Sequence, residues 1–525
     1  MSAAGYIAAV NLEEKMNNRH SSFGYRSRWS GWTGDRGAGY LSHRALSCLW
    51  LLALSIAVII AGCASNLATG EKHLNLISQS QEISMGQQAD SQVIASLGLY
   101  PDSALQRYVQ ELGAKLAQTS ERPDLPWTFR VIDDPVVNAF ALPGGFIYVT
   151  RGLMTYVENE AQLSGVIGHE IGHVTAQHAV HSMSTQQVTQ LGVTAGMMIK
   201  PELQRYEQFV NAGLGLLFLK FSRDDESQAD HLGIRYMVRA GNDPRQMVPV
   251  FDMLNRVSQA SGGGRLPEWL ETHPNPANRS GRIQKELDTL KIDPSRLSVN
   301  QNSYLSLIDG MVFGQNPREG FFRDNYFYHP DLAFAYEFPS GWQTVNLKEA
   351  ITAVSRDQDA VMQITVTDAN SSGEAARQFF GQEGVQAERQ ETGNLNGLPA
   401  VSAQFSAQTE QGVLHGKAAF VEHEGRTYRI LAYTGERQWP GYRDAIVGSI
   451  QSFRRLTDPK ILQVQPMLVK IITVSQRVAL EELAKQQRSP VQLETLAIIN
   501  QAESNASFKA GDRVKMVIGE KFGAE

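Results

Sequence analysis

The chain has 525 residues, of which 42% are hydrophobic and 19% are charged, and its formal net charge is -6 at pH 7. This length predicts about two to four domains, and the apolar fraction is sufficient for packed cores. A mildly acidic chain without a block of like charges does not suggest a nucleic-acid-binding protein, so we expect no nucleic acid among its partners.

The long apolar run of the chain, residues 46–62, follows Arg44 and ends immediately before Cys63. A basic residue, a short apolar core and small residues at its end are typical of a secretory signal. Small residues directly before Cys63 also resemble the bacterial lipobox, in which the cysteine is acylated and becomes the new N-terminus. An uncleaved membrane anchor is the alternative, because this run is at the short limit of a bilayer span. We predict that residues 1–62 are a leader with a lipoprotein signal and that Cys63 is lipidated.

The residue that follows Cys63 indicates to which membrane the lipoprotein is sorted. An aspartate there would indicate retention at the inner membrane, and the residue present is Ala64. Similarity to lipoproteins therefore favours the bacterial periplasm, with a lipid anchor in the outer membrane. Cys48 lies inside the leader, so no disulfide is expected in the mature protein. Residues 1–40 are polar and aperiodic, and they are either an extended n-region or the result of a start site assigned too early.

After a linker at residues 63–75, the pattern becomes that of a folded domain. Apolar residues recur at helical spacing over residues 80–118 and predict two amphipathic helices. Residues 127–133 predict a β-strand, which Asp134-Pro135 ends.

The stretch HEIGH carries the motif His-Glu-x-x-His on an apolar segment with helical spacing. Two imidazoles four residues apart lie one helical turn apart, so His169 and His173 can bind one Zn²⁺ while Glu170 points at the water that the metal binds. A chain of this length contains the motif by accident about once in fifty cases. Two histidines on a half-buried helix therefore remain the alternative unless a third ligand is found.

A candidate third ligand is Glu226, which lies with Asp230 on a second predicted helix. Two histidines and one glutamate are a standard ligand set of catalytic zinc, with water in the fourth position. Asp230, one turn beyond Glu226, is placed to accept the outer N–H of a ligand histidine, and we expect this histidine to be His169. The alternative is a solvated acidic face that pairs with Arg223 and Arg235.

Three stretches in this order resemble the gluzincin metallopeptidases of the CAAX prenyl protease and HtpX type, closest to their periplasmic BepA/LoiP-like branch. They are NAFALPGGFIYVTRGL, HEIGH and SRDDESQAD. The resemblance covers about residues 76–295 and implies a mainly helical zincin domain with a small edge sheet. It also implies that Asn138 to Val149 form a strand beside the cleft that pairs with extended substrate, with Asn138 as a substrate contact. The β-forming residues Phe146 to Val149 and the preceding turn Pro143-Gly144-Gly145 agree with this.

Further residues of the motif region are open to two interpretations. Residues 188–221 are rich in Gly, Ala, Met and Leu, which predicts either ordinary packing or a hydrophobic lip for unfolded clients. His178 and His181 fall outside the expected metal geometry, so we interpret them as surface or helix-packing histidines.

The segment after the second helix is interrupted by Gly262-Gly263-Gly264, which predicts a flexible break. In BepA-like proteins a histidine in a following His-Pro loop can bind the zinc as a fourth ligand and hold the enzyme off, and the resemblance assigns this gating role to His273. The alternative is a turn residue before Pro274. Arg279 or Arg282 is expected either to stabilise the oxyanion or to pair with the acidic helix.

From residue 327 to residue 456 the pattern has period two and predicts an antiparallel-sheet α+β domain, separated from the first domain by a linker at residues 296–326. A hairpin over residues 417–434 should turn at Glu424-Gly425. Two helices are expected to cover one face of the sheet. The predicted strands are 333–338, 360–367, 400–405 and the two of the hairpin, and the predicted helices lie near 372–381 and 441–453.

The last unit, residues 460–520, has the pattern of a small β-α-α-β module. Leu496, Asn500 and Ala510-Gly511-Asp512 resemble the LysM peptidoglycan-binding module, and a generic tail of the same pattern is the alternative. The whole chain is thus predicted to be an α+β multidomain protein.

These elements together predict a zinc metalloendopeptidase of the bacterial envelope with one Zn²⁺ per chain. Its expected substrates are unfolded or misassembled periplasmic and outer-membrane proteins, as in protein quality control. One rival is a lipoprotein scaffold that binds peptidoglycan and keeps the zinc site latent. A second rival is a zinc hydrolase of the cell wall.

Overall fold

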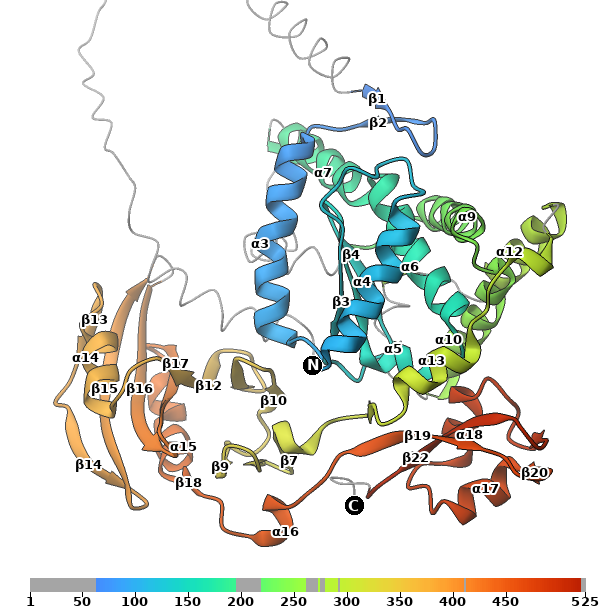
Figure 1. Cartoon of the computed structure of the whole chain (residues 1–525). Helices are drawn as coiled ribbons and strands as arrows, with labels where there is room; N and C mark the ends of the chain where they lie inside the picture. Colours follow the sequence, from blue (N-terminus) through green and yellow to red (C-terminus); the bar gives the residue numbers. More distant parts are fainter. Residues whose placement is uncertain are drawn as a thin grey trace, which may run out of the picture.

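The computed structural model describes residues 63–194, 219–260, 272–273, 279–290, 293–409 and 412–520. The apolar run at 46–62, the glycine break at 262–264 and most of the 188–221 stretch lie outside these described residues. Figure 1 shows three parts: a helical part in blue to green, a sheet-rich middle part in yellow to orange, and a small red C-terminal module.

No helix within the described residues has the length and apolar character that crossing a membrane requires.

The helical part surrounds one central helix, α6, whose residues from Ala161 to Thr175 are all buried. The neighbouring helix α9 approaches it closely, since a Cβ added at Gly172 of α6 would lie 2.9 Å from the backbone oxygen of Ala229 in α9. This close approach fixes the side chains of α6 and α9 relative to one another. The helices are α3 (Gln79–Leu97), α4 (Ser103–Ala117), α5 (Arg151–Tyr156), α6 (Glu160–Thr175), α7 (His178–Thr194), α9 (Arg223–Ala240), α10 (Met247–Ala260), α12 (Arg279–Thr289) and α13 (Gln301–Ile308).

Local sequence signals set the ends of these two helices. The side chain of Asn159 caps α6 by accepting a hydrogen bond from the backbone N–H of Gln162. Ser222 and Asp225 form a capping box at the start of α9. Gly241 ends α9 in the left-handed conformation at φ 78°.

A small sheet lies beside α6 and corrects one sequence-based expectation. Its order is β3 (Thr128–Ile132), β5 (Phe146–Thr150), β4 (Ala139–Leu142), with β5 parallel to β3 and antiparallel to β4. The stretch from Asn138 to Val149 is therefore two strands rather than one, joined by a turn in which Gly144 and Gly145 have φ 82° and 100°. The β-forming residues make the central strand β5, which is paired on both sides. The edge strands of this sheet are β3 and β4.

The middle part is built on an antiparallel sheet, as the period-two pattern predicts. Its strand order is β10-β11-β12-β17-β16-β15-β13, with β14 paired to β15. Glu424 and Gly425 form the predicted two-residue turn, with φ 48° and 71°. The bounds are β10 (Gln343–Asn346), β11 (Ala350–Val354), β12 (Ala360–Thr367), β13 (Val385–Ala387), β14 (Glu391–Leu395), β15 (Leu398–Thr409), β16 (Gly412–His423) and β17 (Arg426–Gly435).

The two helices of the middle part cover opposite faces of this sheet, so the prediction that both cover one face is wrong. Phe379 of α14 (Ser372–Phe380) packs with Phe420 of β16. Ile446 of α15 (Trp439–Gln451) belongs instead to the cluster that contains Val421. Neighbouring residues of a strand point to opposite faces, so these clusters lie on different sides of β16. A smaller sheet of β18 (Arg454–Arg455), β9 (Phe334–Glu337), β8 (Tyr326–His329) and β7 (Phe321–Arg323) completes this part.

The C-terminal module has the predicted β-α-α-β order. The linker strand β6 (Val312–Phe313) joins its sheet, giving the order β22-β19-β6. The mixed helix and sheet architecture of the chain is thus confirmed, and the LysM assignment stays a prediction. The bounds are β19 (Met467–Thr473), β20 (Val478–Ala479), α17 (Leu480–Gln486), α18 (Leu493–Ile499), β21 (Ser507–Phe508) and β22 (Arg513–Ile518).

Candidate active site

Helix α6 places the three polar residues of the HEIGH motif in the interior. His169, Glu170 and His173 are each at most 3% exposed. The Nε2 atoms of His169 and His173 lie 3.0 Å apart. Because burial lowers the pKa of both imidazoles, that of His173 to about 4, both rings are neutral at pH 7 and can offer a lone pair.

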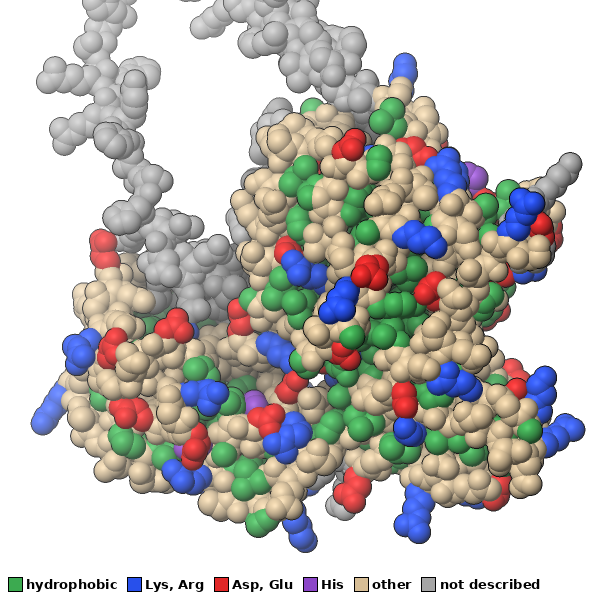
Figure 2. All heavy atoms as spheres, in the orientation of Figure 1, with side chains coloured by type: hydrophobic (Ala, Val, Ile, Leu, Met, Phe, Trp, Pro, Cys, Tyr) green, Lys and Arg blue, Asp and Glu red, His purple; other side chains and the backbone are tan. Residues whose placement is uncertain are grey.

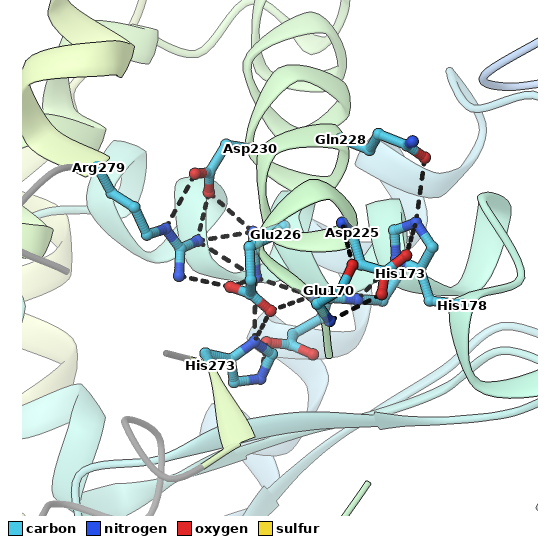
Figure 3. Close-up of polar contacts among 11 residues, drawn as sticks. Glu170, His173, His178, Asp225, Glu226, Gln228, Asp230, His273 and Arg279 are labelled. Carbon is cyan, nitrogen blue, oxygen red and sulfur yellow. Dashed lines mark hydrogen bonds and ion pairs between the residues drawn. The ribbon is translucent and has the colours of Figure 1, made fainter. Parts of the chain in front are cut away.

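Helix α9 brings two carboxylates to these histidines (Figure 3). Glu226 places Oε1 at 3.3 Å from His173 Nε2 and Oε2 at 3.6 Å from His169 Nε2. Asp230 places Oδ1 at 3.0 Å from His169 Nδ1, the arrangement expected from the sequence. Glu226 is 0% exposed and Asp230 4% exposed, so the alternative of a solvated acidic face does not apply. Arg235 pairs elsewhere, with Glu121.

His273 completes a group of four possible ligands. Its Nδ1 lies 2.8 Å from Glu226 Oε1 and 3.3 Å from His169 Nε2, and the residue is 1% exposed. One donor atom from each of His169, His173, Glu226 and His273 lies within 4.8 Å of the others. The alternative of a simple turn residue before proline does not account for a ring directed into this cluster.

The donor set fits a zinc ion. Four ligands at about 2.0 Å around a tetrahedral zinc lie about 3.3 Å from one another. The measured separations between His169 Nε2, His173 Nε2 and the Glu226 oxygens are 3.0 to 3.6 Å. Three imidazoles and a carboxylate whose possible ligand atoms gather at one buried place would be stabilised by a cation there.

Glu170 differs from the other members of the cluster because its Oε1 atom is buried and accepts no hydrogen bond from the described residues. His273 Nε2 lies 3.7 Å from this oxygen. Burial raises the pKa of Glu170 above its usual value, although the charge of His273 opposes the shift. A carboxylate in this state is suited to take and return a proton.

Arg279 acts on the acidic helix, which is one of the two roles weighed for it. It is 0% exposed, and its guanidinium donates through Nη1 to Glu226 Oε2 at 2.6 Å and through Nε to Asp230 Oδ2 at 2.9 Å. Burial opposes ionisation of Glu226, but the charge of His273 and hydrogen bonds to His173 and His273 hold its pKa well below the usual value. Arg282 instead donates to Ser227 at 3.2 Å.

Two further residues of the sequence analysis lie near the site. Asn138 stands before β4, where its backbone exchanges hydrogen bonds with Thr150 and its side-chain Oδ1 is buried without a hydrogen-bond partner among the described residues. His178 is a packing residue rather than a surface residue: it is 2% exposed, lies outside the group of four possible ligands and places Nδ1 at 2.9 Å from Nδ1 of His173. The positive φ of 60° at Gln177, between α6 and α7, is the feature that turns the chain back toward His173. Only the close spacing of the two histidines in the sequence hinted at this contact.

Comparisons with known proteins agree with this geometry. Residues 103–287 match the model of Peptidase family M48. The chain is 31% identical over 238 residues to the beta-barrel assembly-enhancing protease of Escherichia coli (strain K12), which covers 44% of this chain and 48% of that relative. It is 35% identical over 167 residues to the mitochondrial metalloendopeptidase OMA1 of Arabidopsis thaliana, over 31% of this chain and 32% of that relative. The chain thus spans about half or less of the length of these relatives.

Proposed function

We propose that this chain is a zinc-dependent endopeptidase of Peptidase family M48, whose model matches residues 103–287. The observation that carries the proposal is the buried group of His169, His173, Glu226 and His273, with Glu170 beside it. Such a donor set holds one zinc ion per chain. When bound, zinc polarises a peptide carbonyl and lowers the pKa of its water to about 7.

Proton transfer and the positioning of the ligands are assigned to residues of the chain. Glu170, with a free carboxylate oxygen and a raised pKa, takes the proton of the attacking water and returns it to the leaving amine. Asp230 accepts from His169 Nδ1 and so holds the ring with Nε2 directed into the cluster. Arg279 holds Asp230 and Glu226 in place. Burial opposes ionisation of Asp230, but the charge of Arg279 lowers the pKa of this carboxyl.

Strand β4 supplies a surface for extended substrate. Among the described strands it pairs only with β5, so its other edge is not paired with a strand and suits main-chain pairing with an extended peptide. Ala141 and Leu142 of β4 line a small pocket together with His173, which places this edge beside the cluster. Main-chain pairing with β4 favours unfolded polypeptide segments over folded proteins. The substrate class we propose is therefore unfolded or misassembled envelope proteins.

The proposed location and attachment are supported by the leader sequence and by the relatives. A lipobox-like sequence before Cys63 supports lipidation and anchoring to the outer membrane on the periplasmic side, and the name of the Escherichia coli relative concerns beta-barrel assembly. Peptidoglycan is a further candidate partner through the LysM-like module. Digestion of denatured protein compared with purified sacculi separates the endopeptidase from a cell-wall hydrolase or a latent scaffold, because neither rival degrades denatured protein.

The decisive experiment measures bound zinc and proteolysis on the same variants. We expect Glu170→Gln to retain zinc and lose cleavage, since it removes only the proton acceptor, while His173→Ala and Glu226→Ala lose the metal. The matched control is His231→Ala, which removes an exposed histidine of α9 that pairs with Glu286. If Glu226→Ala kept full zinc and activity, the assignment of the metal site would be wrong.

His273 gives the proposed enzyme a closed state. As a fourth ligand, its imidazole would occupy the position that the attacking water needs, so the resting enzyme would be inactive. We expect His273→Ala to cleave an unfolded test protein faster at neutral pH while zinc stays bound. Equal or slower cleavage with zinc intact would show that His273 instead assists substrate binding or the transition state.

A further inference from the structure

The outer nitrogen of His173 faces a different kind of partner from that of His169. His169 Nδ1 faces the carboxylate of Asp230. His173 Nδ1 faces the Nδ1 of another imidazole, His178, at 2.9 Å, with the ring centroids 4.9 Å apart and the ring planes at 76°. Two nitrogens at this distance form a hydrogen bond only if one carries the proton and the other offers a lone pair. The position of that proton decides whether His173 Nε2 is free to bind a metal.

The far side of His178 determines where the proton lies (Figure 3). His178 Nε2 lies 3.3 Å from Gln228 Oε1 and 3.6 Å from Asp225 Oδ1. The amide nitrogen of Gln228 donates to the carboxylate of Glu71 at 2.9 Å, so its oxygen is the atom turned toward His178. Amide oxygens and carboxylates are acceptors only. Nε2 of His178 therefore carries the proton, and its Nδ1 offers the lone pair.

We propose that His178 is a positioning residue which, held by Gln228, accepts the N–H of His173 and so keeps the Nε2 lone pair of His173 directed at the metal. The direction of donation is the same at every step: Gln228 donates to Glu71, His178 donates to Gln228, and His173 donates to His178. The opposite tautomer of His173 would place a proton on the ligating nitrogen. This inference rests on the proposed function, because it assumes that a metal binds at the cluster.

The hydrogen-bonded series His173, His178, Gln228 and Glu71, called the relay below, also connects two distant segments of the chain to the site. Glu71 lies between β1 (Cys63–Ser65) and β2 (Lys72–Leu74), and Gln228 lies on α9 two residues beyond Glu226. His178 is the first residue of α7, directly after the turn at Gln177. Three elements thus meet behind His173, on the side away from the cluster.

The test distinguishes the effect of losing the hydrogen bond from the effect of changing the volume of the side chain. In His178→Asn, Oδ1 is attached to Cγ as Nδ1 is in histidine and can still accept from His173, whereas His178→Leu fills similar space without an acceptor. We expect His178→Leu to weaken zinc affinity about 10- to 100-fold, the usual cost of losing the partner of a ligand histidine. We expect His178→Asn to stay within about threefold of the parent. Gln228→Leu should fall between them, because Asp225 remains as an acceptor for His178.

Zinc affinity is measured on the full chain by competition with a chromophoric chelator, and the d–d absorption of the Co²⁺-loaded protein reports ligand geometry. His231→Leu is the control, since it removes an imidazole of α9 that pairs with Glu286. Thermal unfolding of the metal-free proteins shows whether each variant folds. The relay is wrong if His178→Leu binds zinc as the parent does, or if folded His178→Asn is as weak as His178→Leu. A parent that binds no zinc would overturn the proposed function instead.

Discussion

The C-terminal module and the middle part both follow the helical part in sequence, but they pack against it differently. Among the described residues, the module shares the hydrophobic core of the helical part, and the middle part does not. Residues of the module such as Val469, Leu496 and Met516 belong to the same buried cluster as Ile167 of α6. The middle part has hydrophobic clusters of its own. A cavity of about 650 Å³ lies between the middle part and the helical part, and Figure 2 shows the surface hollowed there.

Two lysines show the difference at atomic scale. Lys515 of the module is 0% exposed and donates to the carbonyl oxygens of Thr155 and Val157 at 3.0 and 2.9 Å, directly before α6. Lys348 of the middle part has a side chain that is 31% exposed and pairs with Asp133 and Glu319. The module is therefore packed as an integral part of the helical part, whereas the middle part is an attached domain with a partly solvated contact.

The largest effect is expected for Lys515→Met. This change leaves the carboxylate of Glu158, which pairs with Lys515 at 2.9 Å, and two carbonyl groups without their buried donor. Removing one partner of a buried ion pair costs about 3–5 kcal/mol, so denaturant unfolding followed by circular dichroism should show a loss of this size. Lys470→Met is the matched control, because Lys470 lies in the same module but its side chain is 45% exposed, and its loss should cost under about 1 kcal/mol. Equal losses for the two variants would show that the module does not stabilise the peptidase fold through Lys515.

Acid should weaken the middle part through His329. Burial lowers the pKa of His329 to about 4, below the unfolded value of about 6.5. The unfolded state therefore binds the proton first, so the contribution of His329 is complete above pH 6.5 and is lost as the pH falls toward 4. The loss amounts to at most about 3 kcal/mol. The C-terminal module has no histidine in residues 460–520.

The pH dependence is tested by replacing the titrating ring. His329 Nδ1 accepts from the backbone N–H of Leu332, and His329→Asn keeps an acceptor while removing the titration. We expect this variant to flatten the unfolding free energy of the middle part between pH 6.5 and 4. His415→Asn is the control, since it removes a partly exposed histidine of the same part. An unchanged slope in His329→Asn would assign the acid sensitivity to other groups.

The sequence predicted the local elements and the motif geometry well. The hairpin turn at Glu424-Gly425 has a glycine at one of its two positive-φ positions, and the spacing of His169 and His173 follows from the helical period alone. Glu226 could be paired with them because few residue types complete a zinc site. In each case the prediction depends either on residues that are close in sequence or on the small set of residue types that can bind zinc.

Features that depend on the packing of distant segments could not be predicted. The central position of β5 is set by its pairing with β3, and the side of the sheet taken by α14 is set by the path of its connections. Nothing in the sequence marks Lys515 as buried, because a lysine in a strand usually points to solvent. The contact between His178 and His173 likewise depends on the backbone at Gln177.

The smallest effect is expected for Lys348→Met, at the contact that attaches the middle part. Asp133 retains Arg151, whose Nε lies 2.6 Å from Oδ1 and whose side chain is 2% exposed, so no buried carboxylate loses its last partner. A partly exposed ion pair contributes about 1 kcal/mol or less, so the unfolding free energy should change little. The orientation of the middle part should vary more widely, which small-angle X-ray scattering detects as a larger radius of gyration. Arg151→Met is the contrasting variant, because it removes the buried partner of Asp133 and should cost about 3–5 kcal/mol. A loss above about 2 kcal/mol for Lys348→Met would place this contact in the same class as Lys515 and contradict the distinction between an integral module and an attached domain.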